Sequence, residues 1–107
     1  MTLQQMRYAI TIADCGSMNE AAHQLFITQP SLSSTIKELE KELGTPLFIR
    51  SNRGIRITQE GQEFLGYARQ IIDQYGILEE RFIDRASRRT KFSISTQHYS
   101  FAVKAFI

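Results

Sequence analysis

The 107-residue sequence has a single cysteine and no run of apolar residues long enough to cross a bilayer. Cys15 therefore cannot form an internal disulfide, and no second cysteine or paired histidine lies near it at metal-ligand spacing. We expect Cys15 to be a small packed residue at a helix end, with a redox switch as the weaker alternative, and we expect no metal site. A membrane span needs about 18 consecutive apolar residues, and a secretory signal begins with basic residues followed by an apolar run. Because both are lacking, we expect a cytoplasmic protein with no membrane partner.

Signatures of catalysis are lacking as well. The two histidines, His23 and His98, are far apart in the sequence, and neither belongs to a nucleophile or phosphate-loop motif. Each is expected to be a surface or packed histidine. The sequence therefore predicts a protein that is not an enzyme and that holds no cofactor within this stretch of chain.

Charge of either sign is modest, but it is unevenly distributed. A net charge of +2 is too small to indicate a nucleic-acid partner by itself. Between Leu43 and Gln59, however, the chain has no acidic residue and three arginines, Arg50, Arg53 and Arg56. This segment forms a local basic patch. The hydrophobic content of 42% is that of a globular protein, and the length allows one small domain plus an extension.

What the sequence does contain is two short amphipathic segments within residues 17–43. Ser17 can cap a first helix while Glu20 reaches back to the amide of the cap residue. Thr28 can cap a second helix, in which Pro30 is tolerated because it lies in the first turn. A turn of about three residues between the segments requires a sharp corner, so we predict a helix-turn-helix.

The second helix has two different faces. Its apolar residues recur at helical spacing and form one stripe facing a core: Leu32, Ile36, Leu39 and Leu43. Gly44 supplies the stop. The solvent face near its start carries small or hydrogen-bonding side chains, with no acid before Glu38: Gln29, Pro30, Ser31, Ser33, Ser34 and Lys37. The N-terminal end of such a helix can enter the major groove of DNA. The alternative interpretation is an ordinary two-helix corner with a polar surface.

Residues 17–50, SMNEAAHQLFITQPSLSSTIKELEKELGTPLFIR, resemble the N-terminal domain of LysR-type transcriptional regulators. The shared pattern runs from a Ser before paired alanines through Gln-Pro to Leu-Glu and Leu-Phe-x-Arg, and the resemblance covers about the first ninety residues. It implies that Arg53 belongs to a wing and that the following residues face DNA: Gln29, Pro30, Ser31, Ser33 and Ser34. Many relatives have a long basic or amide side chain where this chain has Ser34 and Thr35, so the base preference at these positions is not implied.

Two strands are predicted after Gly44. Apolar residues flank a Ser-Asn-Arg-Gly turn in TPLFIRSNRGIRIT, which predicts a hairpin, the wing of a winged helix-turn-helix. We expect Arg53 at its tip in the adjacent minor groove, and Arg50 and Arg56 near phosphates. A hairpin with solvated arginines is the alternative.

Before the corner, Thr2 and Gln5 predict a capping box that opens the first of three helices.

A long helix is predicted from Thr58 to about Arg88. Its apolar residues follow the spacing of a coiled-coil seam: Phe64, Ala68, Ile71, Tyr75, Leu78 and Phe82. The first turn or two can pack on the helix's own domain, but a domain this small cannot cover the whole seam. We therefore expect residues 71–82 to form a homodimer with two-fold symmetry, whose recognition helices read an inverted repeat in double-stranded DNA.

The predicted fold is mainly α, with a winged helix-turn-helix of three helices and a two-stranded wing (1–58), a linker and dimerisation helix (59–89) and a short strand and helix fragment (90–107). In the resembling family such a fragment begins an effector-binding domain, so the resemblance implies a truncated domain and, in a full-length protein, a small-molecule inducer. The prediction is a sequence-specific DNA-binding transcriptional regulator. A helical module that binds another protein is the alternative from a different class.

Overall fold

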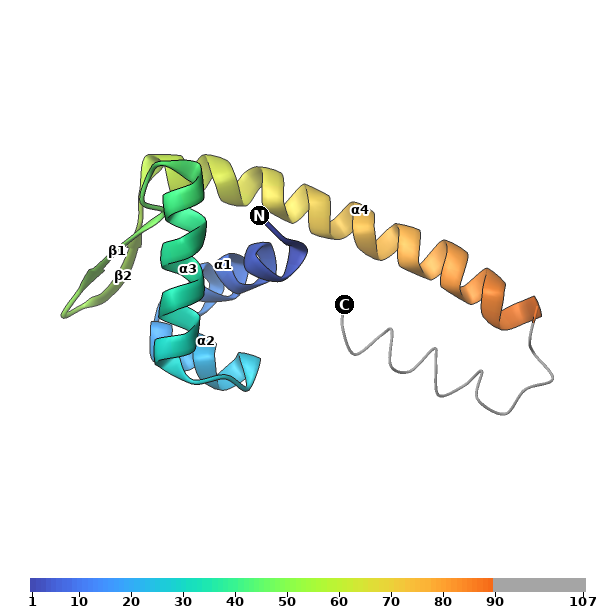
Figure 1. Cartoon of the computed structure of the whole chain (residues 1–107), viewed down its shortest axis with the longest axis horizontal. Coiled ribbons are helices and arrows are strands. Elements are labelled where there is room, and N and C mark those ends of the chain that lie inside the picture. The colour runs from blue at the N-terminus through green and yellow to red at the C-terminus, as the bar shows by residue number, and fades with distance from the viewer. Residues whose placement is uncertain (90–107) are drawn as a thin grey trace. The chain divides into compact units, whose positions relative to one another are not determined.

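The structure is a computed structural model that describes residues 1–89, with side chains as far as Ile83. Its elements, in chain order, are α1 (Leu3–Cys15), α2 (Met18–Leu25), α3 (Gln29–Leu43), β1 (Phe48–Ser51), β2 (Gly54–Ile57) and α4 (Gln59–Arg89) (Figure 1). The chain forms two compact units, Met1–Gln70 and a second that begins at Ile71. This confirms the predicted fold class, a mainly helical winged helix-turn-helix followed by a long helix. The strand and helix predicted within 90–107 lie outside the described residues.

The predicted caps Thr2 and Ser17 begin α1 and α2. Thr2 Oγ1 accepts a hydrogen bond from the Gln5 amide (3.0 Å), and Gln5 Oε1 accepts one from the Thr2 amide (2.9 Å), which completes the capping box of α1. Gly16, at φ 71°, ends this helix. Ser17 Oγ then accepts from the Glu20 amide at 3.3 Å and caps α2. The return bond expected from the Glu20 side chain is not among the hydrogen bonds of the described residues.

Main-chain hydrogen bonds set the corner between α2 and α3. The Phe26 amide donates to His23 O (3.2 Å) and the Ile27 amide to Ala22 O (3.1 Å), the two bonds of a Schellman motif. The motif needs a left-handed residue, and Phe26 adopts that conformation (φ 58°) although it is not a glycine. Its side chain is 95% exposed, whereas Ile27 packs against the core. Thr28 Oγ1 then accepts from the Ser31 amide at 3.3 Å and starts α3.

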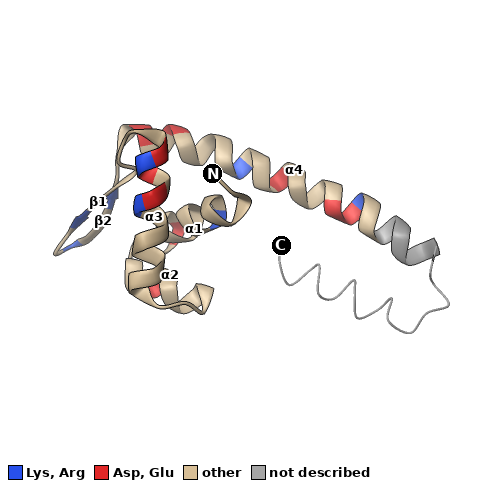
Figure 2. Ribbon diagram, viewed as in Figure 1, with Lys and Arg blue, Asp and Glu red and all other residues tan. Residues whose placement is uncertain are grey.

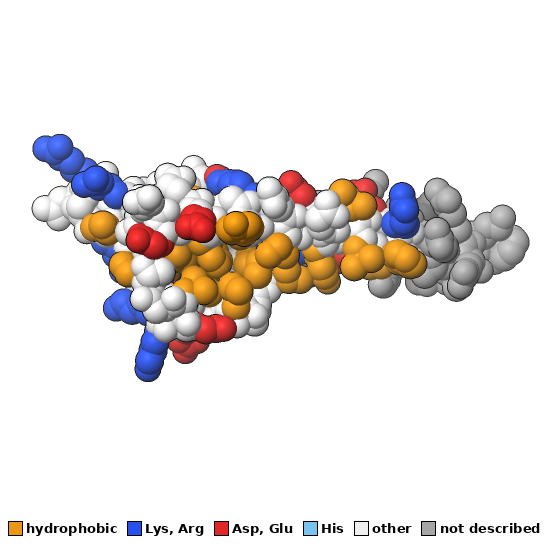
Figure 3. Space-filling model, turned by 90° about the horizontal axis from the view of Figure 1, so that it is seen from above, with side chains coloured by type: hydrophobic (Ala, Val, Ile, Leu, Met, Phe, Trp, Pro, Cys, Tyr) orange, Lys and Arg blue, Asp and Glu red, His pale blue; other side chains and the backbone are white. Residues whose placement is uncertain are grey.

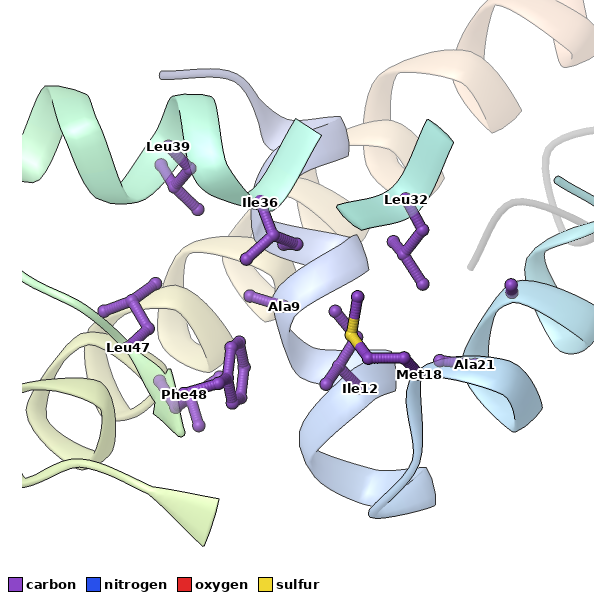
Figure 4. Close-up of a cluster of buried hydrophobic side chains, with 11 residues drawn as sticks. Ala9, Ile12, Met18, Ala21, Leu32, Ile36, Leu39, Leu47 and Phe48 are labelled. Carbon is purple, nitrogen blue, oxygen red and sulfur yellow. The ribbon is translucent and has the colours of Figure 1, made fainter. Parts of the chain in front are cut away.

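The core lies where α1, α2, α3, the start of β1 and the first turns of α4 meet. Its buried side chains are Ala9, Ile12, Met18, Ala21, Ala22, Leu32, Ile36, Leu39, Leu47, Phe48 and Leu65. Figure 4 shows Ile12 and Met18 turned toward Leu32, and Leu47 and Phe48 lying below Leu39 and Ile36. The predicted stripe of α3 is therefore buried at Leu32, Ile36 and Leu39, with Leu43 half-buried at its end.

Cys15 is the last residue of α1, and its side chain packs partly buried against the core. Burial, together with the charges of Glu20 and Asp14, raises the pKa of its thiol. The thiol is therefore protonated near neutral pH and is a poor nucleophile. Within the described part of the chain, no three His, Cys, Asp or Glu side chains are grouped so that they could hold a metal ion. No helix within residues 1–89 combines the length and apolar character that crossing a membrane requires.

The wing is an antiparallel hairpin that leads directly into α4. Its register pairs Phe48 with Ile57 and Arg50 with Ile55. Thr58 joins the hairpin to the helix, because its Oγ1 accepts from the Gly61 amide (2.9 Å) and donates to Pro46 O (2.8 Å). This confirms the predicted cap.

Gly61 allows the first turn of α4 to lie against the chain that enters β1. A Cβ atom at this position would be 2.3 Å from the Leu47 carbonyl oxygen and 2.9 Å from a methyl group of Ile57. Gly66, a little over one turn further on, has nothing within 4 Å of the same point. The two glycines lie in the same helix, but only Gly61 has no room for a Cβ atom.

We expect Gly61→Ala to lower the free energy of unfolding by about 1–3 kcal/mol, because the methyl group collides with backbone. Gly66→Ala is the matched control, and it should raise the same quantity by about 0.5–1 kcal/mol through helix propensity alone. Urea unfolding followed by far-ultraviolet circular dichroism measures both. Equal effects of the two substitutions would contradict the close packing at Gly61.

Candidate nucleic-acid interface

The N-terminal half of α3 presents the predicted contact residues on its outer side. Pro30, Ser31, Ser34 and Lys37 are exposed, and Gln29 and Ser33 are half-buried. A shallow depression on this side is lined by Gln29, Pro30, Ser33, Ser34, Lys37, Glu38 and Lys41. Five of the six residues predicted on this helix therefore share one surface. Ser31 differs, because its hydroxyl accepts a hydrogen bond from Thr28 Oγ1 (2.8 Å) at the helix cap.

A second cleft lies between the start of α2, the start of α3 and the wing. Its lining residues are Ser17, Met18, Asn19, Gln29, Arg50, Ser51, Asn52, Gly54 and Ile55. Gln29 belongs to both hollows, so the surface of α3 continues without a break toward the hairpin. Asn19 and Asn52 were not predicted, because each lies near a helix start or turn where a polar residue is expected for local reasons.

The three wing arginines have different surroundings. Arg50, on β1, donates a hydrogen bond from Nη2 to Ser33 Oγ on α3. Arg53 lies in the turn, where its amide donates to Ser51 Oγ at 3.3 Å, and its side chain is exposed. Arg56, on β2, is exposed opposite Ile49. Figure 2 shows that the hairpin carries basic and no acidic side chains, whereas acidic side chains gather on the C-terminal half of α3.

Two contacts fix the wing relative to the helices. Glu40 Oε2, on α3, accepts hydrogen bonds from the amides of Leu47 (2.6 Å) and Phe48 (3.2 Å), at the entrance to β1. The Ile55 amide, on β2, donates to Gly16 O at the end of α1 (3.3 Å). Glu40 was not predicted, because an acid in a helical segment rich in charged side chains gives no sign that it turns toward backbone amides.

The predicted seam of α4 divides between core and surface. Phe64 packs half-buried against the core, and Ala68 is buried. Ile71, Leu78 and Phe82 are exposed, each by 42% or more, and Tyr75 is half-buried. Tyr67 and Ile77 are also exposed, although neither belongs to the predicted seam. Figure 3 shows hydrophobic side chains gathered along one side of this helix.

Comparison with known proteins gives one family. Residues 3–62 match the family model described as bacterial regulatory helix-turn-helix protein, lysR family. The regulator BudR of Raoultella terrigena is 43% identical over 72 residues, which cover 67% of this chain and 25% of BudR. TfdT of Cupriavidus pinatubonensis is 34% identical over 91 residues, which cover 85% of this chain and 36% of TfdT. The chain thus spans about a quarter to a third of the length of these curated relatives.

Solved structures agree with that assignment. The CbnR_DBD-DNA complex matches with a TM-score of 0.75 and 37% identity, covering 80% of this chain and 99% of that chain. The complex of BenM_DBD with catB site 1 DNA matches with a TM-score of 0.69 and 36% identity, covering 77% and 96%. Both neighbours were solved bound to DNA.

We expect Glu40→Gln to lower the free energy of unfolding by about 1–3 kcal/mol, because two backbone amides lose a charged acceptor. Glu38→Gln removes the same charge from the exposed side of α3 and is the control, with an expected change within about 0.5 kcal/mol. Urea unfolding compares the two variants. If Glu40→Gln behaves like the control, the carboxylate does not anchor the wing.

Proposed function

This chain belongs to the lysR family of bacterial regulatory helix-turn-helix proteins, and we propose that it regulates transcription by binding double-stranded DNA at specific sequences. The observation that carries the proposal is the continuous surface formed by the start of α3 and the wing. It holds small polar and basic side chains, and the nearest acid on α3 is Glu38. The start of α3 before Glu38 and the wing carry no acid, so they can approach phosphates without repulsion between like charges.

In the proposed complex, the N-terminal half of α3 lies in the major groove. Gln29 can bond bidentately to adenine, and Ser33 and Ser34 are short enough to let the helix approach the base edges. Pro30 adds an apolar contact. Ser31 and Lys37, at the margins of this face, bond to phosphates, which fix the position of the protein on the duplex.

The wing supplies the remaining contacts. Arg53, exposed in the turn, enters the adjacent minor groove, where a narrow groove concentrates negative potential. Arg50 and Arg56 contact phosphates from the two strands. Support comes from the CbnR and BenM DNA-binding domains, which share this fold and were solved with DNA.

A homodimer formed through α4 completes the proposal. Residues 1–58 are assigned to DNA binding and 59–89 to dimerisation. The support is the row of exposed apolar side chains in the second unit, Ile71, Leu78 and Phe82, because a soluble chain gains free energy by burying such a row. Tyr75 continues the same helical spacing between Ile71 and Leu78. Phe64 and Ala68 belong to the same predicted seam, but they pack at the core. A two-fold dimer presents two recognition helices, so the proposed target is an inverted repeat.

We expect Arg53→Ala to weaken binding to duplex DNA and to reduce the slope of log K against log salt concentration by about one, because one cation that displaces counterions from the duplex is lost. Arg81→Ala, which removes an exposed arginine of α4, should leave the slope unchanged. Fluorescence anisotropy at several salt concentrations measures the slope. An unchanged slope in Arg53→Ala would contradict the wing contact. Absence of DNA binding by the parent chain would favour a protein-interaction module instead.

We expect Leu78→Lys to convert the dimer to monomer, because a buried charge in the seam is costly. Asp73→Asn changes the net charge by the same amount on another side of α4 and should leave the dimer intact. Sedimentation velocity distinguishes the two species. A parent chain that is monomeric at high concentration would refute dimerisation through this helix.

A further inference from the structure

One contact of the interface joins two elements that are both proposed to touch DNA. Arg50 Nη2 donates to Ser33 Oγ, and the two residues are 17 positions apart in the chain. Arg50 is held in place from both sides of the hairpin. Glu40 bonds the amides at the entrance to β1, and Ile55, the strand partner of Arg50, bonds Gly16 O. The guanidinium thus reaches α3 from an anchored strand.

This contact determines what the Ser33 hydroxyl can still do. A serine hydroxyl has one proton to donate and two lone pairs that accept, whereas a guanidinium only donates. One Ser33 lone pair is therefore taken by Arg50, and the proton must find an acceptor elsewhere. A neighbour shows the usual alternative, because Thr35 Oγ1 donates back to Ser31 O of its own helix (3.0 Å). No such bond is found for the Ser33 hydroxyl among the described residues.

The free proton of Ser33 lies at the DNA-facing surface. Ser33 lines the depression on α3, one helical turn after Gln29, which lines the cleft shared with Arg50. A hydroxyl that accepts from a cation is polarised, and this strengthens the hydrogen bond that it donates. In the major groove, purine N7, guanine O6 and thymine O4 accept, while the amino groups of adenine and cytosine donate.

We propose that Arg50 is a positioning residue for base recognition: it fixes Ser33 as a hydrogen-bond donor, so that this position of α3 reads an acceptor on a base edge. The inference rests on the proposed function and refines it. Arg50 thereby affects sequence preference through Ser33, in addition to any contact that its remaining N–H groups make with phosphate. A wing residue contributes to the specificity of the recognition helix.

The test compares base preferences selected from a pool of random duplexes. Ser33→Ala should relax the preference at one base pair of each half-site by about 3- to 10-fold, the effect of one hydrogen bond. Arg50→Gln should relax the same base pair, and the double variant should show no further loss there. Arg56→Gln is the matched control, since it removes the same charge from the other strand of the wing. It should lower affinity and leave the preferences unchanged.

A second measurement identifies the acceptor. In the selected duplex, 7-deaza purines remove N7, 2-aminopurine removes guanine O6 and 5-methyl-2-pyrimidinone removes thymine O4. One such replacement should weaken binding of the parent chain about 3- to 10-fold and have no effect on Ser33→Ala or Arg50→Gln. Circular dichroism confirms that the variants are folded.

Different outcomes separate the inference from the proposed function. If Arg50→Gln weakens all sequences equally and adds to the effect of Ser33→Ala, Arg50 serves phosphate only and the inference is overturned. The inference is also overturned if every base replacement changes the DNA affinity of the parent chain and of the two variants by the same factor. If the parent chain binds no duplex or shows no base preference, sequence-specific binding fails and the inference fails with it.

Discussion

The close packing of α2 against α1 and α3 is the contact on which the interface depends. Ala9 of α1 and Ala21 of α2 are both fully buried in the core, so neither position has room for a larger side chain. From α3, Leu32 packs into the same core, with Ile12 and Met18 turned toward it (Figure 4). Because α3 is held by its inner face, its outer face is left to be polar. A larger side chain at either alanine would move α3, and with it every residue of the proposed contact surface.

The two halves of α3 perform different tasks. The first half carries no acid, whereas Glu38, Glu40 and Glu42 lie in the second. Carboxylates repel phosphate, so the second half limits how much of the helix can lie along a duplex. One of these acids is used within the protein, because Glu40 binds the start of β1. The same helix therefore presents a surface outward at one end and holds the wing at the other.

Local signals made much of the fold predictable. Thr2, Ser17, Thr28, Gly44 and Thr58 each cap a helix through a hydrogen bond with a backbone group three or four residues away, and the structure places all five at the helix ends where the sequence predicts them. The apolar stripe of α3 was predictable for the same reason, since helical periodicity alone defines which residues share a face.

Contacts between elements were not predictable in this way. Glu40 meets amides seven and eight residues away, and Arg50 meets Ser33 across 17 residues, and both depend on how the hairpin turns back. The residues of α4 show a further limit. Ala68 is buried and Leu78 is exposed, yet both fit the same apolar spacing. Periodicity identifies a face and does not say whether the chain's own core or a partner covers it.

Phe26 illustrates a separation between the shape of a corner and the residue that occupies it. The hydrogen bonds of the corner involve only main-chain groups of residues 22–27, and the benzyl group lies almost wholly in solvent. The hydrogen bonds of the corner therefore do not use this side chain. Position 26 is a suitable site to attach a fluorescent or spin label beside α3, where it can report the approach of a macromolecule while the scaffold keeps its geometry.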